Sequence, residues 1–488
     1  MRPVSPQTIH FGTDGWRGVV ADDFTYDNVR AVSQAVAWYL AEDPRPVVVG
    51  HDTRYCAELF AREVARVLAA NGRHVLLLDG PAPTQVSSWT VVDRRAAGGV
   101  VVTASHNPPE FNGLKYKPDY GGSAPPEVVG ALEELSARAQ RDGVRAMPFD
   151  QAEASGSVEV VDPRPNYIAQ IGRMVDLPRL RDSGLHILHE AMHGSGAGYV
   201  RMLLSGGRTV VDELHGDRNP GFGGMHPEPI EQYMPEAMAR MRAGGYDLGI
   251  ANDGDADRVG IIDERGVFVN QLQVMALLSM YLLEKRGERG ALVRSLTSSA
   301  MVDKLGERFG VPVYELRVGF KYIGPKMTET DALIGGEESG GFGFRGHLPE
   351  RDGILAGLFV AQMIIDYGMP LSRILAHLED LVGPHAYARH DISLPRDGYD
   401  ARREEMYARI KSSPPATLAG TPIARTRDDD GFKFYFDDGS WVLVRFSGTE
   451  PLIRVYSEAS TRERVDELLQ ALESYLGLEA PVAAGAAH

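Results

Sequence analysis

The segment Thr103-Ala104-Ser105-His106-Asn107-Pro108 contains a serine placed for group-transfer chemistry. The apolar run from Ala97 to Val102 precedes it and predicts a buried strand, and Asn107-Pro108-Pro109 prevents an immediate helix. Ser105 is therefore expected in a loop at the carboxyl end of a strand, where open α/β sheets bind ligands. A hydroxyl held there can act as a nucleophile or as a phosphoryl carrier. The alternative is an ordinary turn, since turns are rich in serine, asparagine and proline.

Three aspartates, Asp253, Asp255 and Asp257, alternate along a short polar segment that follows an apolar run. Alternation places their side chains on one side, and a curved loop would let three oxygens converge on one cation. Hard oxygen ligands favour Mg²⁺ or Ca²⁺. A solvated acidic loop is the alternative, but carboxylates this close repel one another. Arg258, directly after the aspartates, would serve a phosphate bound to the same ion.

An EF-hand calcium loop is the nearest rival for the three aspartates, because Glu264 falls at the twelfth position of such a loop. The glycine that an EF-hand needs at its sixth position is replaced by Arg258, and apolar strands rather than helices flank the segment. The pattern therefore favours a cation site in a strand-to-strand loop.

Two further loops offer groups that bind sugars or phosphates. Glu337, Glu338 and Ser339 lie between four glycines, and carboxylates there would accept hydrogen bonds from sugar hydroxyls. A strand-turn-strand element near the end of the chain combines a guanidinium, hydroxyls and a free backbone amide, which are the parts of a phosphate pocket. Its residues are Arg445, Ser447, Gly448 and Thr449, with Arg454 as an additional charge. A plain structural turn is the alternative for each loop.

The segment His189-Glu190-Ala191-Met192-His193 matches the zinc-protease motif letter for letter. That motif needs a helix, so that both histidines lie on one face. An apolar strand precedes the segment, and Gly194-Ser195-Gly196 would end any helix at once. The pattern favours a loop at the end of a strand. No glycine pattern for a dinucleotide or a nucleoside triphosphate is present.

Alternating strand and helix patterns surround these loops. An apolar strand followed by a polar, glycine-rich loop recurs in three successive units, so the sequence predicts three α/β units with largely parallel sheets. After about residue 385 the pattern changes to paired strands and one amphipathic helix, for which Ser460 and Glu463 are the predicted capping pair. The segment 11–18 is predicted to be a flexible loop, and residues 125–162 a surface helix and a linker.

Composition limits the class of protein. The formal net charge of −16 argues against a nucleic-acid binder, and any anionic ligand must be met by a local group of arginines and lysines. The single cysteine, Cys56, cannot form an internal disulfide. No signal-peptide pattern is present, and no run approaches the ~20 apolar residues that span a bilayer. A cytoplasmic protein without a membrane partner is expected.

Taken together, the four loops resemble the motifs of the α-D-phosphohexomutase family, the phosphoglucomutases and phosphomannomutases. The matching segments occur in the family's order and are residues 103–108, 253–258, 336–340 and 445–449, with 11–18 similar to the family's amino-terminal signature. The resemblance spans about residues 8 to 475. It implies three related α/β domains with mixed, largely parallel sheets and a smaller C-terminal α+β domain around a central cleft. The expected domains are 1–160, 161–272, 273–388 and 389–488.

The resemblance also implies a mechanism. Ser105 would be carried as phosphoserine, and one Mg²⁺ per chain would be held by Asp253, Asp255, Asp257 and an oxygen of that phosphoserine. The phosphoryl group would pass to a hexose phosphate, giving a bisphosphate that turns over without leaving before Ser105 takes back the other phosphoryl group. Glucose 1,6-bisphosphate would be an activator. Small-molecule sugar phosphates are the expected partners of a monomer or homodimer.

Individual roles follow from positions that match the family. Arg17, Lys115 and Arg258 would lie near the reacting phosphate, and His106 or Lys115 would act as acid or base. Glu337 and Ser339 would hold sugar hydroxyls, and Lys321 belongs to a loop that closes over substrate. The second phosphate is expected at Arg445, Ser447, Gly448 and Thr449, with Arg454 nearby.

One departure concerns the sugar. Many dual-specificity and glucosamine-type members have histidine where this chain has Gly341, and the Glu338 position varies between subfamilies. The sequence therefore favours a phosphoglucomutase that also accepts mannose, with phosphoglucosamine mutase as the alternative. A metal-dependent sugar phosphatase that uses the same serine and a catalytically silent sugar-phosphate sensor are the other hypotheses.

Overall fold

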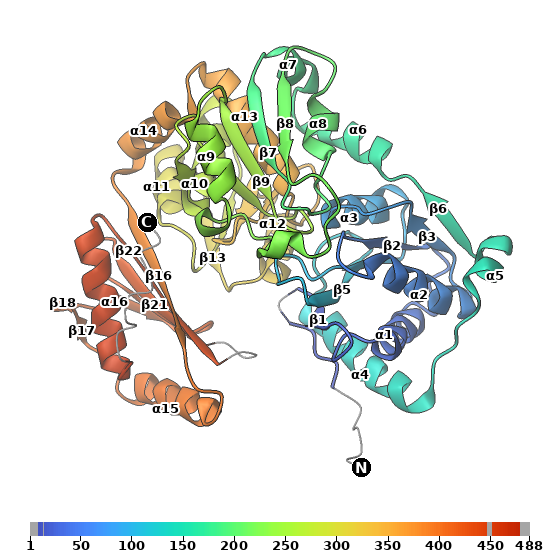
Figure 1. Cartoon of the computed structure of the whole chain (residues 1–488). Helices are drawn as coiled ribbons and strands as arrows, with labels where there is room; N and C mark the ends of the chain where they lie inside the picture. Colours follow the sequence, from blue (N-terminus) through green and yellow to red (C-terminus); the bar gives the residue numbers. More distant parts are fainter. Residues whose placement is uncertain (1–7, 13, 447–450, 479–488) are drawn as a thin grey trace.

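The computed structural model describes residues 8–12, 14–446 and 451–478. The described chain forms three successive α/β units and a smaller α+β unit, which confirms the predicted fold class (Figure 1). We call the units domains I to IV. The strands β6 and β16, at Val158–Val161 and Ala386–Ser393, run across two of the predicted domain limits, and the limits stay a prediction.

Domain I is built around a six-stranded sheet in the order β1-β5-β4-β2-β3-β6. Strand β4 is wholly buried and pairs in parallel with β2 and in antiparallel with β5, so the carboxyl end of β4 opens at the centre of the sheet. The elements are β1 Trp16–Val19, α1 Tyr26–Tyr39, β2 Val47–His51, α2 Ala57–Ala70, β3 Val75–Leu78, α3 Thr84–Asp93, β4 Gly98–Val102, β5 Phe111–Pro118, α4 Pro126–Asp142, α5 Phe149–Ala154 and β6 Val158–Val161.

Two predictions for domain I were wrong in part. Residues 16–19, placed in a flexible loop, form the edge strand β1, because they pair with β5 and Trp16 stacks on Phe24. The predicted linker before residue 162 contains α5 and β6, and β6 completes the sheet by pairing with β3. In both segments long-range pairing overrides a local pattern that is rich in glycine or charge.

Domains II and III repeat the arrangement with sheets ordered β11-β10-β9-β7-β8 and β13-β12-β14-β15. In each, parallel central strands end at a polar loop that leads to an antiparallel strand. Domain II contains α6 Arg164–Met174, α7 Leu177–Asp182, β7 His186–Glu190, α8 Tyr199–Leu204, β8 Val210–Leu214, η1 Phe222–Gly224, η2 Glu231–Tyr233, α9 Pro235–Arg242, β9 Leu248–Asn252, β10 Val259–Ile262 and β11 Phe268–Val269. Domain III contains α10 Gln271–Met280, η3 Tyr281–Lys285, β12 Leu292–Ser295, α11 Met301–Phe309, β13 Val313–Leu316, α12 Phe320–Thr330, β14 Ile334–Gly336, β15 Phe342–Phe344, α13 Gly353–Tyr367 and α14 Leu371–Val382.

The described part of domain IV contains an antiparallel sheet in the order β16-β22-β21-β20-β19, a small β17-β18 pair and two helices. Its elements are β16 Ala386–Ser393, α15 Tyr399–Ser412, β17 Thr417–Leu418, β18 Thr421–Pro422, β19 Arg425–Arg427, β20 Phe432–Tyr435, β21 Trp441–Phe446, β22 Leu452–Ala459 and α16 Arg462–Leu476. The N-cap of α16 is Thr461, whose side chain accepts from the Arg464 amide, so the predicted cap at Ser460 was wrong by one residue.

The main hydrophobic core joins domains I to III, and domain IV has a core of its own with a small apolar contact to domain III at Leu296. One buried cluster extends from Val48 in domain I to Val382 in domain III, whereas domain IV has a cluster of its own between Ile392 and Leu478. Figure 1 shows the domain IV ribbon, in red, set apart beside the other three domains.

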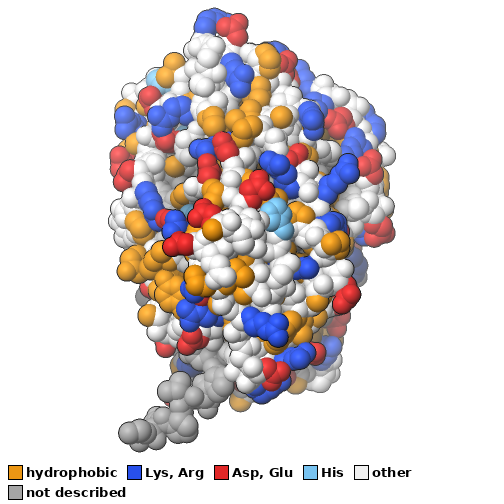
Figure 2. Space-filling model, turned by 90° about the vertical axis from the view of Figure 1, so that its right-hand side faces the viewer, with side chains coloured by type: hydrophobic (Ala, Val, Ile, Leu, Met, Phe, Trp, Pro, Cys, Tyr) orange, Lys and Arg blue, Asp and Glu red, His pale blue; other side chains and the backbone are white. Residues whose placement is uncertain are grey.

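Charges of both signs are mixed over the face shown in Figure 2. Across the described ranges no single helix is long and apolar enough to cross a bilayer, and α13 with α14 passes that test only as a pair bent by 85°.

Candidate active site

Ser105 lies in the turn that follows β4. The residue is 1% exposed and has a φ of +51°, which is uncommon for a residue with a Cβ and has to be held by its surroundings. Its amide donates to Thr103 Oγ1 over 2.9 Å, and its carbonyl accepts from Arg54 Nη2 over 2.6 Å. Both backbone ends of the serine are therefore fixed by hydrogen bonds.

Arg54 is a fully buried arginine that the sequence reasoning did not select. Besides the Ser105 carbonyl, its guanidinium donates to the carbonyls of Asn107, Pro108 and Phe111. Asp52 pairs with Arg54 Nε at 3.3 Å and accepts the Thr103 hydroxyl at 2.6 Å. One arginine, located in the turn that follows β2, thus holds the backbone of the serine loop through its carbonyl groups.

The three aspartates occupy the turn between β9 and β10. Asp253, Asp255 and Asp257 are each 0% exposed, and one carboxylate oxygen of each lies within 4.8 Å of the others. Ser105 Oγ donates to Asp253 Oδ2 over 2.8 Å, so the serine of domain I and the aspartates of domain II form one site. Gly254 permits this approach, because a Cβ there would lie 2.5 Å from the Ser105 carbonyl oxygen.

The aspartate cluster has the chemistry of a cation site. Asp255 Oδ1 and Asp257 Oδ1 are buried without a hydrogen-bond partner among the described residues, and an unpaired buried carboxylate oxygen is costly. Burial, together with the charges of Asp255 and Asp257, holds the pKa of Asp253 well above its usual range. A divalent cation would offset this repulsion, and three carboxylates fit the hard oxygen preference of Mg²⁺.

Lys115 projects from β5 into the same cluster and is 1% exposed. Its Nζ lies 2.8 Å from Asp255 Oδ2, 3.1 Å from Asp257 Oδ2 and 2.8 Å from Asp14 Oδ2. Burial acts to lower the pKa of Lys115, but these carboxylates raise it above its usual value. Lys115 therefore stays a cation beside the aspartates and supplies a fixed positive charge.

Arg258 and Arg17 add positive charge around the serine. The Arg258 amide donates to Asp253 Oδ1 over 3.0 Å, and its guanidinium pairs with Glu228 at 3.0 Å. Arg17 Nη1 donates to Asn107 Oδ1 in the serine loop. Burial is the main cause that lowers the pKa of Arg17, with the Arg258 charge acting in the same direction.

His106 follows the serine, and its Nδ1 lies 3.5 Å from Ser105 Oγ. Burial and the positive charges of Arg258, Arg17 and Lys115 hold the pKa of His106 well below its usual range. The ring is therefore neutral near pH 7 and has a nitrogen available to accept a proton.

Arg351, also missed by the sequence reasoning, connects three domains at the site. Its Nη2 lies 2.8 Å from Asp257 Oδ2 and also binds Asp14, while Nη1 lies 3.6 Å from Glu337 Oε2. Nothing local in the sequence marks this arginine. Lys115 and Lys117, in contrast, alternate on one strand, which was a usable signal that two cations share a face.

The predicted sugar loop follows β14 and faces the site through Glu337. Glu337 Oε1 accepts from the Gly319 amide over 2.8 Å, and burial raises the pKa of Glu337 to about 7 against the opposing charge of Arg351. Ser339 is partly exposed two residues later. Lys321, also partly exposed, lies in the first turn of α12 immediately after Gly319.

Position 341 has no room for a side chain. A Cβ on Gly341 would lie 2.1 Å from Arg351 Cδ. The glycine and the placement of Arg351 therefore depend on each other.

The predicted phosphate pocket is described only in part. Arg445 and Arg454 are register partners on β21 and β22, and both are partly buried. Arg445 Nη2 pairs with Asp430 Oδ1 at 3.0 Å. The remaining predicted members Ser447, Gly448 and Thr449 lie outside the described residues.

The zinc-motif look-alike is a strand end, as predicted. His189 lies in β7 and contacts Glu213 Oε2 at 3.0 Å and Asn252 Oδ1 at 3.1 Å. His193 follows in a turn, where its Nδ1 contacts the Asp217 carbonyl at 3.0 Å. The two histidines thus have separate partners. Through Asn252, which donates to the Arg258 carbonyl, His189 braces the turn that carries the aspartates.

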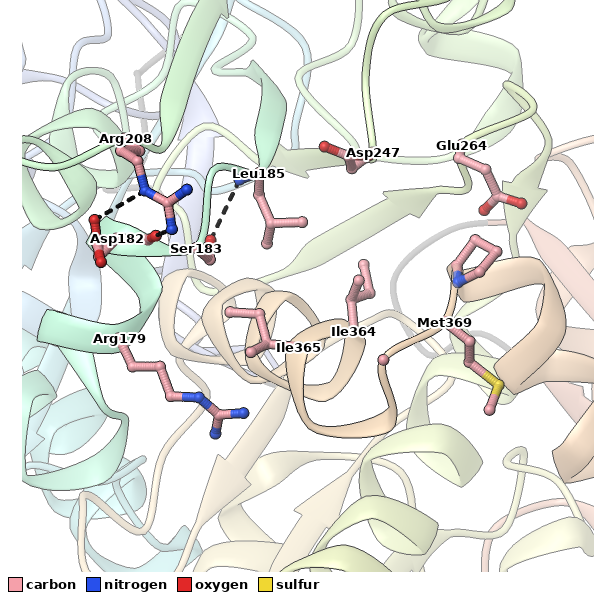
Figure 3. A pocket seen from close by; sticks show the side chains of 12 residues that line it. Arg179, Asp182, Ser183, Leu185, Arg208, Asp247, Glu264, Ile364, Ile365 and Met369 are labelled. Atoms are coloured by element: carbon pink, nitrogen blue, oxygen red, sulfur yellow. Dashed lines mark hydrogen bonds and ion pairs between the residues drawn. The ribbon is translucent and has the colours of Figure 1, made fainter.

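A surface cavity of about 610 Å³ lies between domain II and the α13–α14 turn, and no predicted site residue lines it (Figure 3). Ile364, Ile365, Leu185 and Met369 contribute apolar lining, and Arg208, one of the charged residues around the cavity, is paired with Asp182.

Comparisons with known proteins match the whole arrangement. Profiles described as phosphoglucomutase/phosphomannomutase match residues 8–142 as alpha/beta/alpha domain I, 165–266 as domain II, 270–381 as domain III and 404–474 as the C-terminal domain. A phosphoglucomutase/phosphomannomutase of Thermococcus kodakarensis is 32% identical over 94% of this chain and 96% of its own length. A probable phosphoglucosamine mutase of Methanopyrus kandleri is 31% identical, again over 94% and 96%. The crystal structure of a putative phosphomannomutase from Thermus thermophilus superposes with a TM-score of 0.84 at 35% identity, covering 97% of this chain and 100% of that one.

Proposed function

Because this chain belongs to the phosphoglucomutase/phosphomannomutase family of mutases, we propose that it interconverts hexose 1-phosphate and hexose 6-phosphate through a phosphoserine at Ser105. The observation that carries the proposal is the 2.8 Å hydrogen bond between Ser105 Oγ and Asp253, inside a buried trio of carboxylates. A serine hydroxyl beside a cation site and several fixed positive charges has the parts that phosphoryl transfer requires.

Asp253, Asp255 and Asp257 would hold the Mg²⁺ on which the family depends. When bound, Mg²⁺ neutralises phosphate charge in the transition state. The chain's own cations act in the same place. Lys115 is fixed by two of the aspartates, and Arg258 is held at its amide by Asp253 and at its guanidinium by Glu228. Such preorganised charges stabilise the transferring phosphoryl group without reorganising during the reaction.

In the transfer, the bond between Ser105 Oγ and phosphorus breaks and a bond from phosphorus to a sugar hydroxyl oxygen forms. The proton of that hydroxyl passes to a base, and Ser105 Oγ takes up one proton in return and leaves as the neutral hydroxyl, which is the form that donates to Asp253. We assign the base to His106, because its Nδ1 lies 3.5 Å from Ser105 Oγ and its lowered pKa leaves the ring unprotonated, whereas the raised pKa of Lys115 keeps that amine protonated. The reverse step returns the other phosphoryl group of the hexose 1,6-bisphosphate to Ser105.

The remaining predicted residues hold the substrate in both orientations. Glu337 and Ser339 would accept or donate hydrogen bonds to the sugar hydroxyls that stay fixed as the bisphosphate turns. Arg445, with Arg454 and the loop containing Ser447, Gly448 and Thr449, would bind the phosphate that is not being transferred. Lys321 would approach from the α12 side of the cleft.

We propose glucose as the main sugar, with mannose as a further substrate. Gly341 supports this choice, because Arg351 fills the space that a histidine at this position would need. Phosphoglucosamine mutase is the alternative within the family, since relatives with both descriptions are about equally similar. Glucose 1,6-bisphosphate is proposed as the activator, and the enzyme as a cytoplasmic monomer or homodimer.

A coupled assay across glucose, mannose and glucosamine 1-phosphates with Mg²⁺ tests the proposal. Glucose 6-phosphate is expected to form fastest, and the intact mass of the purified chain is expected to include one phosphoryl group on Ser105. Release of inorganic phosphate in place of isomerisation would identify a phosphatase instead, and tight binding without conversion would identify a sensor.

A further inference from the structure

Asp430 lies between two predicted substrate-binding elements and contacts both. Its Oδ1 accepts from Arg445 Nη2 at 3.0 Å and from Arg445 Nε at 3.2 Å. Its other oxygen, Oδ2, accepts from the Val318 amide at 2.8 Å. The carboxylate therefore ties an arginine of domain IV to a loop of domain III.

That loop, residues 317–321, also reaches the sugar-binding side of the cleft. Gly319, next to Val318, donates its amide to Glu337 Oε1 over 2.8 Å. The Val318 side chain packs on a cluster that contains Trp441, with Leu296 of domain III. Lys321 follows two residues after Gly319. Two adjacent amides of one short loop thus bind both predicted subsites. Val318 donates to Asp430, which holds Arg445 of the phosphate pocket, and Gly319 donates to Glu337 of the sugar loop.

The geometry also fixes how Arg445 is presented. A guanidinium is planar and has two edges that can each bind a bidentate acceptor. Asp430 occupies the edge formed by Nε and Nη2, which leaves the edge formed by Nη1 and Nη2 directed away from that carboxylate. A phosphate can bind this second edge while Asp430 holds the first.

We propose that Asp430 is a positioning residue that orients Arg445 and couples phosphate binding in domain IV to the ordering of loop 317–321. This inference rests on the proposed function, because it takes Arg445 as a ligand of the substrate phosphate. Only a carboxylate serves both contacts, since each of its oxygens accepts from a donor. An asparagine would present an amide nitrogen to one of the two donors and would break one half of the bridge.

Steady-state kinetics of the full-length enzyme with glucose 1-phosphate test the coupling. Asp430→Asn is expected to raise KM by about tenfold, because a charge-assisted pair is lost. Asp428→Asn is the matched control: it removes the same charge two residues away, where the carboxylate pairs with Lys411 at 3.5 Å. In an Arg445→Met background, Asp430→Asn is expected to add less than about twofold, since contacting residues are non-additive. Asp430→Glu, which keeps two acceptor oxygens, is expected to recover part of the loss.

Limited trypsin digestion supplies a readout that a structural role alone would not change. Glucose 1-phosphate is expected to slow cleavage after Arg317 and Lys321 in the wild-type enzyme and in Asp428→Asn. In Asp430→Asn, glucose 1-phosphate at the same multiple of KM is expected to leave the rate of cleavage at these two sites unchanged.

Two results would overturn the coupling: an equal KM effect of Asp430→Asn with and without Arg445, or full substrate protection of the loop in Asp430→Asn. A wild-type enzyme that does not isomerise any hexose phosphate would instead overturn the proposed function itself.

Discussion

The two ends of the proposed substrate cleft, one at Ser105 and the other at Arg445, differ in how deeply their side chains are buried and in which hydrophobic core supports them. Around Ser105, side chains from domains I, II and III are buried, Lys115 and Arg351 are each fixed by several ion pairs, and these domains share one hydrophobic core. Around Arg445, the arginine remains 21% exposed at its side chain, and domain IV has a separate core. Domain IV meets domain III through polar contacts, such as those of Glu315 with Lys433 and Arg427, and through the small apolar cluster at Leu296.

This difference assigns different tasks to the two ends. Phosphoryl transfer depends on positioned charges, so a rigid, buried end suits the reaction. A bisphosphate that turns over has to be released and held again by its other phosphate. Domain IV has its own core and meets domain III through polar contacts and one small apolar cluster, so it is free to adjust, as interfaces between domains of one chain generally permit. Substitutions around Ser105 are therefore expected to lower kcat, and substitutions around Arg445 are expected to raise KM.

The largest effect is expected at the serine. Ser105→Ala removes the proposed phosphoryl carrier, and kcat is expected to fall by roughly 10⁴ or more, as when a covalent nucleophile is deleted. Intact-mass measurement should show no added phosphoryl group, whereas the exposed Ser205→Ala should leave mass and rate unchanged. Substantial turnover in Ser105→Ala would contradict the assignment of both the carrier and the rigid end.

A large effect is also expected at the aspartates. Asp253→Asn removes one charged group of the proposed Mg²⁺ site, so Mg²⁺ affinity measured by calorimetry should fall by about 100-fold or more, with kcat falling in parallel at fixed Mg²⁺. Asp212→Asn, a partly buried carboxylate of the same domain that pairs with His186, is the matched control. Unchanged Mg²⁺ binding in Asp253→Asn would place the cation elsewhere.

A smaller and different effect is expected at the binding end. Arg445→Met should raise KM for glucose 1-phosphate by about 10- to 100-fold, because bonds to a charged phosphate contribute about 1.5–3 kcal/mol each. The kcat value should change less than KM. Arg462→Met, an exposed arginine of α16 paired with Asp466, is the control in the same domain. A kcat loss as large as the KM change would remove the contrast between the two ends.

The same contrast separates what the sequence could predict from what it could not. Ser105 and the aspartates are marked locally, because a run of apolar residues that stops at a polar loop identifies a strand end. Arg54 and Arg351 have no such mark. Arg351 meets Asp14 across 337 positions of the chain, and only the packed domains bring them together. The edge strand β1 was missed for the same reason, since its glycine-rich segment becomes a strand only against β5.

Glu337 lies between the two ends, and its titration gives the smallest predicted effect. Burial raises its pKa to about 7, so the carboxylate that would accept sugar hydroxyls is largely protonated at pH 6 and ionised at pH 8. KM for glucose 1-phosphate should therefore fall by up to about tenfold over this range. Glu337→Gln removes the titration and controls for the substrate phosphate, which itself ionises near pH 6.

The free energy of unfolding should fall as the pH rises from 6 to 8, the range over which substrate binding is expected to improve. Because the folded-state pKa of Glu337 lies above its ordinary value of 4.5, the folded protein binds the proton more tightly than the unfolded chain. This contribution to the free energy of unfolding, about 3 kcal/mol, is present below pH 4.5 and is lost as the pH rises through about 7. Thermal melts from pH 5 to 8 should then show a smaller decline for Glu337→Gln than for the wild type. If KM changes with pH equally in the wild type and in Glu337→Gln, the Glu337 carboxylate does not bind the sugar hydroxyls. The substrate would then be recognised through its phosphate contacts at the two ends.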